Sequence, residues 1–304
     1  MAAYRLWVEL AIEVLVYVVL IIALVAPEDH ATALLLIPVW MLAVRIALVL
    51  ASFWLSEPLS TAAHLSPSAR WRMWICESVA LYRFQSLIMS GAGPDRFVPQ
   101  AANEKPVIVL LHGIFCNGAI WRPLAAALAD RTGCEVHTPS MPRVTASLAT
   151  QVEDFVALLE AQSNSGARRE VIVIGHSLGG LIAHRAAMRH GDRLGIVRLI
   201  CIGTPHGGSE VARLSRTRIA RDLRPNSPAL ARARSNSIEV VNIFAEHDNL
   251  VVPAQSSRLC CARNIPIAGC GHMALIYSRK VFEILVQEVA REAEHALTAV
   301  SDCR

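Results

Sequence analysis

The sequence predicts an α/β domain, with a mostly parallel β-sheet covered by helices, preceded by a transmembrane helical hairpin. Two long apolar stretches fill most of residues 1–60. From residue 106 onward, short uninterrupted apolar stretches alternate with helical patterns, which is typical of a parallel sheet buried on both faces. The mean hydropathy of the 304-residue chain is +0.41. This value is too high for an ordinary soluble domain and indicates a membrane segment.

The stretches 6–26 and 31–55 are each long enough to cross the ~30 Å hydrocarbon core of a bilayer as a helix. Only the short polar turn at 27–30 separates them. A signal peptide would be shorter and would begin with basic residues. The alternative is a buried helical pair in a soluble protein, and the length of both stretches argues against it. We therefore expect residues 1–60 to form a transmembrane hairpin.

Two charged residues fall within these apolar stretches. In an antiparallel hairpin that turns near residue 28, Glu13 and Arg45 would lie at equal depth. A lone arginine at mid-helix costs about 2.5–3.5 kcal/mol to insert, so we expect the two side chains to pair within the bilayer. The alternative is that each side chain extends independently to the nearer interface.

The loop charges predict the orientation of the hairpin. The turn carries two acids and no Lys or Arg, whereas Arg5 precedes the hairpin and Arg70 and Arg72 follow it. Because positively charged flanks stay on the cytoplasmic side, we expect both termini and the α/β domain to be cytoplasmic. The predicted location is the inner membrane of a bacterium.

Residues 61–105 are expected to connect the hairpin to the α/β domain at 106–304. Ser66-Pro67-Ser68 is a helix-start signal, and the helical pattern continues to Ser90 with tryptophans and arginines interleaved. That mixture suits a membrane interface, and a helix packed on the following domain is an equal alternative. A Gly- and Pro-rich break at 91–94 then precedes an extended lead-in at 95–105.

The α/β domain reads as strands and helices in alternation. The expected strands are 106–111, 134–138, 171–174, 197–202, 239–244 and 263–268, and the expected helices are 119–130, 147–162 and one from about 274. Ligands of such sheets bind beyond the carboxyl ends of the strands. The polar residues with the clearest chemical potential all follow strand ends, so we expect them to meet at one edge.

Ser177 lies at the centre of the pattern, in Gly175-His176-Ser177-Leu178-Gly179 between a buried strand and a helix. A sharp strand–turn–helix connection exposes the serine, and the two glycines avoid collisions with neighbouring backbone. The N–H groups at the start of the helix favour negative charge there. The alternative is a glycine-rich turn whose serine only caps the helix.

A serine hydroxyl needs a base, and the base needs an acid that orients it. His272 follows the last strand in a glycine-rich loop, and Asp248 follows the preceding strand. The chain order Ser177, Asp248, His272 is one in which this triad occurs. Glu246 is the alternative acid.

An oxyanion requires backbone donors, and we expect them to be the N–H groups of Leu178 and Ile114, with Phe115 as the alternative to Ile114. His112, next to this loop, is expected to brace it. His176 is expected to point away from Ser177.

Through these motifs, residues 106–290 resemble the α/β-hydrolase superfamily, in particular its lipases and esterases. The resemblance rests on the Ser177 motif, on His112-Gly113 after a strand, on Gly203-Thr204-Pro205-His206-Gly207-Gly208, and on the Asp248 and His272 loops. It implies an α/β-hydrolase fold and ester hydrolysis through an acyl-enzyme without a cofactor. No Cys/His grouping has the spacing of a metal site, so no metal is expected.

Residues 209–236 are a candidate lid. The segment contains seven arginines, and Val211, Leu214, Ile219 and Leu223 could share one helical face. A basic amphipathic helix can lie on anionic lipid, and a solvated charged face over the pocket is the alternative.

The sequence therefore predicts a membrane-anchored serine hydrolase of carboxylic esters. Its expected partners are the lipid bilayer and a small-molecule or lipid acyl ester, and the net charge of +4 is too small to indicate nucleic acid. The alternatives are a thioesterase or amidase with the same triad, and a non-catalytic membrane scaffold with a hydrolase-like domain. Oligomeric state has no signal in the sequence.

Overall fold

A seven-stranded sheet forms the centre of the computed structural model, which describes residues 2–59, 62–91, 96–97, 105–163, 169–231 and 238–301. The strands are β1 (Arg96–Phe97), β2 (Val107–Leu111), β3 (Val136–His137), β4 (Val171–His176), β5 (Ile196–Ile202), β6 (Glu239–Ala245) and β7 (Arg263–Ile267). Their order is β1-β3-β2-β4-β5-β6-β7, and all neighbours are parallel except β1 with β3.

The predicted architecture is confirmed: a mostly parallel sheet is covered by helices on both faces. Strands β2, β4, β5 and β6 are almost wholly buried apolar residues, which is why they lie in the interior of the sheet. The part of the predicted lead-in that the structure describes is β1, a two-residue antiparallel edge strand. Residues 92–95 and 98–104 of that region lie outside the described residues.

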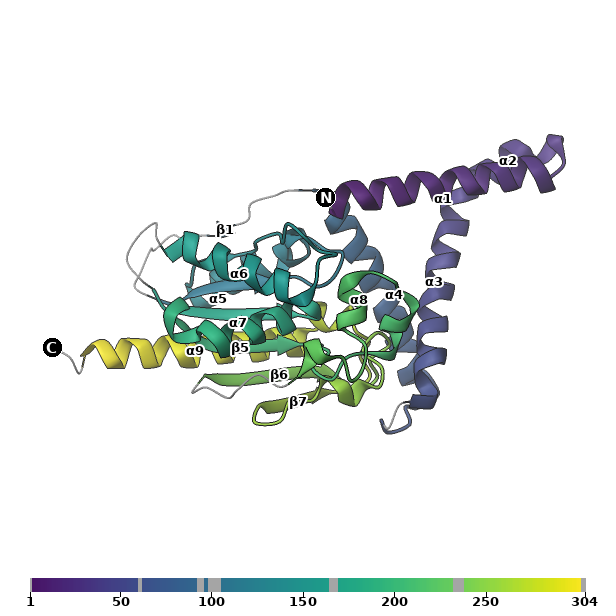
Figure 1. The fold of residues 1–304 in the computed structure, drawn as a ribbon. Coiled ribbons are helices and arrows are strands. Elements are labelled where there is room, and N and C mark those ends of the chain that lie inside the picture. The colour runs from purple at the N-terminus through teal and green to yellow at the C-terminus, as the bar shows by residue number, and fades with distance from the viewer. Residues whose placement is uncertain are drawn as a thin grey trace.

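Helices α5 (Arg122–Thr132) and α9 (Arg279–Ser301) cover one face of the sheet, while α6 (Leu148–Ser163) and α7 (Leu178–Leu194) cover the other (Figure 1). The helix expected at 119–130 begins as a 3₁₀ turn at Gly118–Trp121, and the one expected from 274 begins as a 3₁₀ turn at Ala274–Tyr277. A short helix, α8 (Arg218–Asp222), lies in the candidate lid.

The N-terminal segment contains two helices that are long and apolar enough to cross a membrane. They are α1 (Ala2–Leu24), with a candidate span at Trp7–Leu24, and α3 (Ile37–Ser56). The second apolar stretch was expected to be one helix, but it is divided into α2 (His30–Leu35) and α3. Pro38 has no N–H to donate and is tolerated in the first turn of a helix, so the new helix begins beside it.

Both candidate spans pack against a third helix, α4 (Pro67–Met89). Figure 1 shows α1 running across the top of α3 instead of alongside it, which differs from the simple hairpin that the sequence suggested. The predicted contact between Glu13 and Arg45 is nevertheless present, with Nη2 of Arg45 2.8 Å from Oε2 of Glu13. Arg45 also donates from Nε to Gln85 of α4 at 3.1 Å, so one guanidinium joins all three helices.

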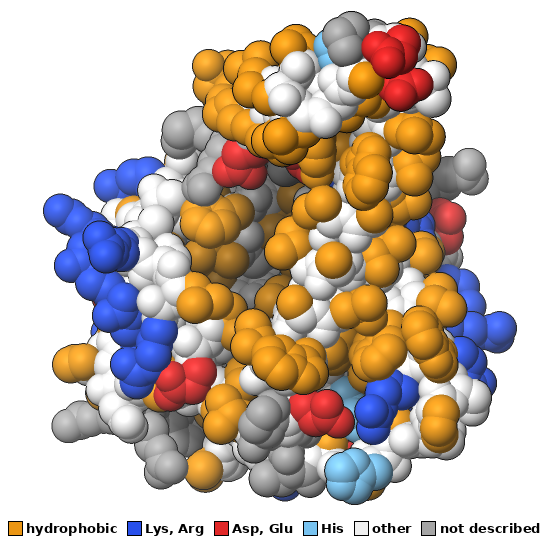
Figure 2. Space-filling model, turned by 90° about the vertical axis from the view of Figure 1, so that its right-hand side faces the viewer, with side chains coloured by type: hydrophobic (Ala, Val, Ile, Leu, Met, Phe, Trp, Pro, Cys, Tyr) orange, Lys and Arg blue, Asp and Glu red, His pale blue; other side chains and the backbone are white. Residues whose placement is uncertain are grey.

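Helix α4 packs on the α/β domain, which is one of the two arrangements that the sequence left open. One face is buried on the α/β domain, and Ala80, Phe84 and Ile88 join the main core. The opposite face exposes an apolar stripe at helical spacing, formed by Trp71, Ile75, Val79 and Tyr82. In Figure 2, hydrophobic side chains run over the face of the molecule that α3 presents to the viewer, and basic side chains gather at its two flanks.

The joint between the three helices predicts non-additive mutations. Glu13→Gln and Arg45→Leu should each lower the thermal stability of the detergent-solubilised protein, because each leaves a charge without its partner. The double variant should lose less than the sum of the two, with a coupling of about 0.5–3 kcal/mol. Glu28→Gln, in the exposed turn, combined with Arg45→Leu is the control and should be additive. Strict additivity of the Glu13 and Arg45 changes would contradict the pairing.

Candidate active site

Ser177 lies at the apex of the turn between β4 and α7. Its backbone has a positive φ of 55° with ψ −125°. Residues other than glycine rarely adopt this conformation, which marks a strained turn. A Cβ on Gly179 would lie 2.5 Å from the carbonyl oxygen of His112 and closer still to that of Leu111. A Cβ on Gly175 would lie 2.5 Å from Gly180. Both glycines are therefore required for the helix to start this close to the sheet, as the sequence predicted.

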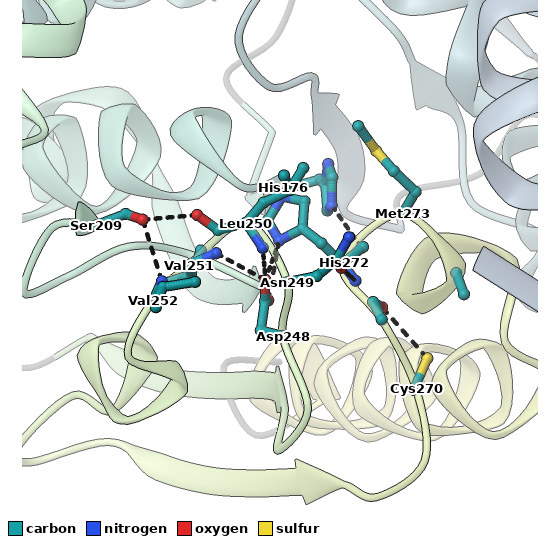
Figure 3. A network of polar contacts seen from close by, with 12 residues as sticks. His176, Ser209, Asp248, Asn249, Leu250, Val251, Val252, Cys270, His272 and Met273 are labelled. Carbon is teal, nitrogen blue, oxygen red and sulfur yellow. Dashed lines mark hydrogen bonds and ion pairs between the residues drawn. The ribbon is translucent and has the colours of Figure 1, made fainter. Parts of the chain in front are cut away.

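Asp248 and His272 form a buried pair beyond the ends of β6 and β7. Nδ1 of His272 lies 2.9 Å from Oδ2 and 3.1 Å from Oδ1 of Asp248, and the side chains point toward each other (Figure 3). Oδ1 of Asp248 also accepts the N–H groups of Leu250 at 2.8 Å and Val251 at 2.7 Å. The acid that meets His272 is therefore Asp248, and not the alternative Glu246.

The pKa of His272 is raised above its usual value. Burial on its own lowers this pKa, because only 2% of the residue is exposed. The negative charge of Asp248 and its hydrogen bond, together with the carboxylate of Glu77, favour the protonated ring more strongly. The imidazole is therefore a stronger base than a free histidine.

One cavity of about 230 Å³ brings Ser177 and His272 together. Its walls are mostly apolar and include Phe84 of α4, Leu250, Val251 and Met273. Two of the expected oxyanion residues, Ile114 and Phe115, also line it. Their loop is packed on the serine, since a Cβ on Gly113 would lie 3.1 Å from Cβ of Ser177. Phe115 has a left-handed backbone, with φ 57°. Leu178 directly follows Ser177 as the first residue of α7.

His112 braces this loop, as expected. Its Nδ1 donates to the carbonyl of Gly113 at 2.9 Å, and its Nε2 accepts the N–H of Met141 at 2.9 Å. Complete burial lowers the pKa of His112 to about 4, so the ring is neutral and can both donate and accept. The histidine therefore fixes the position of the loop carbonyl beside Ser177.

His176 has a closer connection with the site than the sequence suggested. Its ring lies 4.8 Å from the ring of His272, centroid to centroid, and its Nε2 donates to the carbonyl of His272 at 3.3 Å. Burial, followed by the neighbouring His272, lowers its pKa well below the usual value. The side chain therefore supports the loop of the histidine as a neutral donor.

Three further polar residues hold the same loops, and the sequence indicates no such role for any of them. Ser209 donates from Oγ to the carbonyl of Leu250 at 2.6 Å and accepts the N–H of Val252 at 3.1 Å (Figure 3). Asn249 and Glu77 contact the backbone of the His272 loop. The one available signal was that Glu77 is the only acidic residue in the sequence of α4.

The candidate lid forms one wall of the cavity, through Val211, Ala212, Ser215, Ala220 and Leu223. It consists of a 3₁₀ turn at Glu210–Leu214, then α8, then a 3₁₀ turn at Pro228–Leu230. The single apolar helical face suggested by the sequence is not formed, because a break at 215–217 separates the two helices: Ile219 is buried, whereas 82% of Leu214 is exposed. Arg232 and Arg234 lie outside the described residues.

Among the described residues, no group of three His, Cys, Asp or Glu side chains is arranged to hold a metal ion.

Comparison with known proteins agrees with this geometry. Residues 108–248, less than half of the chain, match the Alpha/beta hydrolase family. The pimeloyl-[acyl-carrier protein] methyl ester esterase of Aeromonas hydrophila is 38% identical over 92 residues, which are 30% of this chain and 35% of that protein. The Vibrio cholerae esterase of the same name is 37% identical over 97 residues, 31% of this chain and 35% of that protein. The chain thus spans about a third of the length of the curated relatives it matches.

Solved structures show the same fold. The mature lipase of Bacillus licheniformis has a TM-score of 0.54 and 18% identity, and the match covers 65% of this chain and 99% of the lipase. An esterase of Pyrobaculum calidifontis has a TM-score of 0.55 and 17% identity, and the match covers 77% of this chain and 99% of the esterase.

The turn at Ser177 predicts a mutation that the fold cannot absorb. Gly179→Ala should lower the unfolding temperature and reduce the accessibility of Ser177. The reason is that the Cβ added at position 179 meets two backbone carbonyls that cannot rotate away. Overpacking of this kind costs about 1–3 kcal/mol or more. Gly207→Ala is the matched control, since its Cβ would have ordinary contacts of 3.4 Å or longer. Equal unfolding temperatures for the two variants would contradict the packing described here.

Proposed function

We propose that this chain, whose α/β domain has the α/β-hydrolase fold, is a membrane-anchored serine hydrolase that cleaves carboxylic esters. The observation that carries the proposal is the buried Asp248–His272 pair, whose imidazole lines the same cavity as Ser177. A serine on a strained turn, a histidine and a carboxylate that orients the histidine make up the machinery of nucleophilic acyl transfer.

In the proposed mechanism, Oγ of Ser177 attacks the ester carbonyl while Nε2 of His272 takes its proton. Asp248 holds Nδ1–H of the ring and stabilises the imidazolium that forms. The N–H groups of Leu178 and Ile114, or of Phe115 in place of Ile114, receive the oxyanion. His272 then returns its proton to the leaving alcohol, and a water molecule hydrolyses the acyl-enzyme by the same steps.

The cavity favours an apolar acyl group. Its side chains next to Ser177 are mainly aliphatic and aromatic, and its volume of about 230 Å³ is slightly below the usual range for drug-sized ligands. The relatives named as pimeloyl-[acyl-carrier protein] methyl ester esterases support ester hydrolysis. Because they match only about a third of their length, we carry over the ester as the scissile bond and not the pimeloyl group or its carrier.

The anchor in this proposal consists of α1 and α3. Both are exposed over most of their candidate spans, which fits contact with lipid better than burial in a soluble core. The apolar stripe of α4 is also exposed, and in this proposal it contacts lipid as well. With the orientation expected from the charges, the domain faces the cytoplasm.

A fluorophosphonate probe tests the proposal. The full-length protein in detergent should be labelled and should hydrolyse short-chain esters, and Ser177→Ala should abolish both without a change in unfolding temperature. Ser86→Ala, on the exposed side of α4, is the control and should behave as the unmodified protein. A folded protein that neither reacts with the probe nor hydrolyses esters would instead support the non-catalytic scaffold.

In this proposal the candidate lid contacts anionic lipid through its exposed arginines. Replacing Arg216, Arg218 and Arg221 by glutamine should reduce hydrolysis of lipid in anionic vesicles by about tenfold or more, since each basic residue near such a surface contributes about 1 kcal/mol. Hydrolysis of a soluble short-chain ester should change little. The matched control replaces three basic residues of α9: Arg279, Lys280 and Arg291. Equal losses on vesicles and on the soluble ester would refute lipid contact by the lid.

A further inference from the structure

A carboxylate from outside the α/β domain is buried against the loop of His272. Glu77 lies on α4, and only 1% of it is exposed. Its Oε1 accepts the N–H of Met273 at 3.0 Å, and its Oε2 accepts the N–H of Ala274 at 2.9 Å. These are the two residues that directly follow His272, so both oxygens of one side chain hold the loop immediately after the imidazole.

The local sequence is shaped to admit this carboxylate. A Cβ on Gly271 would lie 2.6 Å from Cδ of Glu77 and 2.9 Å from Cζ of Phe53 of α3. A side chain at the position before His272 would therefore displace the side chains of Glu77 and Phe53 from the loop. Gly271 thus has a packing role here that does not depend on the chemistry of the neighbouring histidine.

Helix α3 contacts the same loop through a second link. Oδ1 of Asn249 accepts the N–H of His272 at 3.0 Å, and its Nδ2 donates to Oγ of Ser52 at 2.9 Å. Ser52 in turn donates to the carbonyl of Val49, one turn back on α3. The backbone on both sides of the His272 ring is therefore tied to helices that precede the α/β domain.

We propose that Glu77 is a positioning residue for His272: by accepting both N–H groups that follow the histidine, it holds the imidazole against Asp248 and beside Ser177. This inference rests on the proposed function, in which His272 is the base. It assigns to α4 a task in the active site in addition to its packing between the candidate spans and the α/β domain.

A carboxylate suits this task better than a neutral side chain. Its two oxygens are both acceptors and match two donors, whereas an amide would place its NH₂ group against one N–H. Three titratable groups from different elements act on His272. Asp248 after β6 and His176 at the end of β4 lie against its ring, and Glu77 of α4 acts through its charge. Of these, Asp248 and Glu77 are acidic, and His176 is neutral.

Replacement of Glu77 by glutamine tests the proposal in the full-length protein. Glu77→Gln keeps the shape of the side chain but breaks one of the two hydrogen bonds, so kcat for a soluble ester should fall on the order of 10- to 100-fold, with KM nearly unchanged. Because the Glu77 charge helps to raise the pKa of His272, its removal lowers that pKa. His272 then remains neutral at lower pH values than before. The acid limb of the kcat/KM profile should therefore shift to lower pH.

Two variants separate positioning from a purely structural role. Glu77→Asp keeps the charge but is shorter, so it should restore the acid limb while kcat stays reduced. Glu288→Gln removes a carboxylate that is equally buried at the far end of the sheet, where it pairs with Arg198. This control should lower the unfolding temperature without moving either kcat or the pH profile.

The outcomes distinguish this inference from the proposed function. If Ser177→Ala abolishes activity but Glu77→Gln keeps the original kcat and acid limb, the role of Glu77 is overturned and the hydrolase stands. If the unmodified protein is inactive, the proposed function fails, and NMR titration of the His272 ring still tests Glu77. An unchanged His272 pKa in Glu77→Gln would overturn the inference, and a lowered one would support it.

Discussion

One buried pair, the carboxylate of Asp248 and the imidazole of His272, sets the conditions that the rest of the site must satisfy. Asp248 and His272 are almost completely excluded from water, and a buried carboxylate is costly unless its oxygens are hydrogen-bonded. Asp248 meets this requirement with three donors: two backbone N–H groups of its own loop and the imidazole. The loop that carries Asp248 therefore has to keep a conformation in which its N–H groups stabilise the carboxylate. Ser209, which ties the loop to the start of the candidate lid, extends the same constraint to the cavity wall.

The sheet converts distance along the chain into proximity at the site. Strands β4, β6 and β7 are parallel members of one sheet, so the segments that follow them emerge at the same edge. Ser177 follows β4, Asp248 follows β6 and His272 follows β7. Apolar burial of the strands fixes where each loop begins, and hydrogen bonds within the loops then direct the side chains.

The parts that sequence could predict are those encoded by local pattern. Uninterrupted apolar stretches gave the strands, and the glycines flanking Ser177 gave the sharp turn, because both reflect backbone requirements of a few adjacent residues. The pairing of Glu13 with Arg45 was also predictable, since a lone charge in an apolar helix needs a partner. The division of the second apolar stretch beside Pro38 was not predicted. The stretch is apolar on both sides of Pro38, so hydropathy alone does not show that a new helix starts there, with the proline in its first turn.

Contacts between distant elements could not be predicted. Glu77 precedes His272 by almost two hundred residues, and nothing in the α4 sequence indicates which loop its side chain meets. The role of Asn249 is not visible in the sequence for a related reason: its partners, Ser52 and the N–H of His272, meet it only in the packed structure. The prediction that the candidate lid forms a single amphipathic helix was wrong. The apolar residues have the spacing of one helix, but the break at 215–217 divides the segment.

The placement of Glu77 has a consequence for the energetics of the proposed reaction. The pKa of this carboxyl is raised, by burial and also by the charge of Asp248, although the two N–H groups it accepts and the nearby His272 favour its charged form. In the proposed mechanism, positive charge develops on His272 when it takes the proton of Ser177. Two buried carboxylates favour that charge, Asp248 from the α/β domain and Glu77 from α4. Preorganised charge of this kind stabilises a transient imidazolium without any rearrangement during the reaction. In the proposed mechanism, α4 therefore contributes to catalysis through electrostatics as well as through packing, and removing Glu77 from it would change the base.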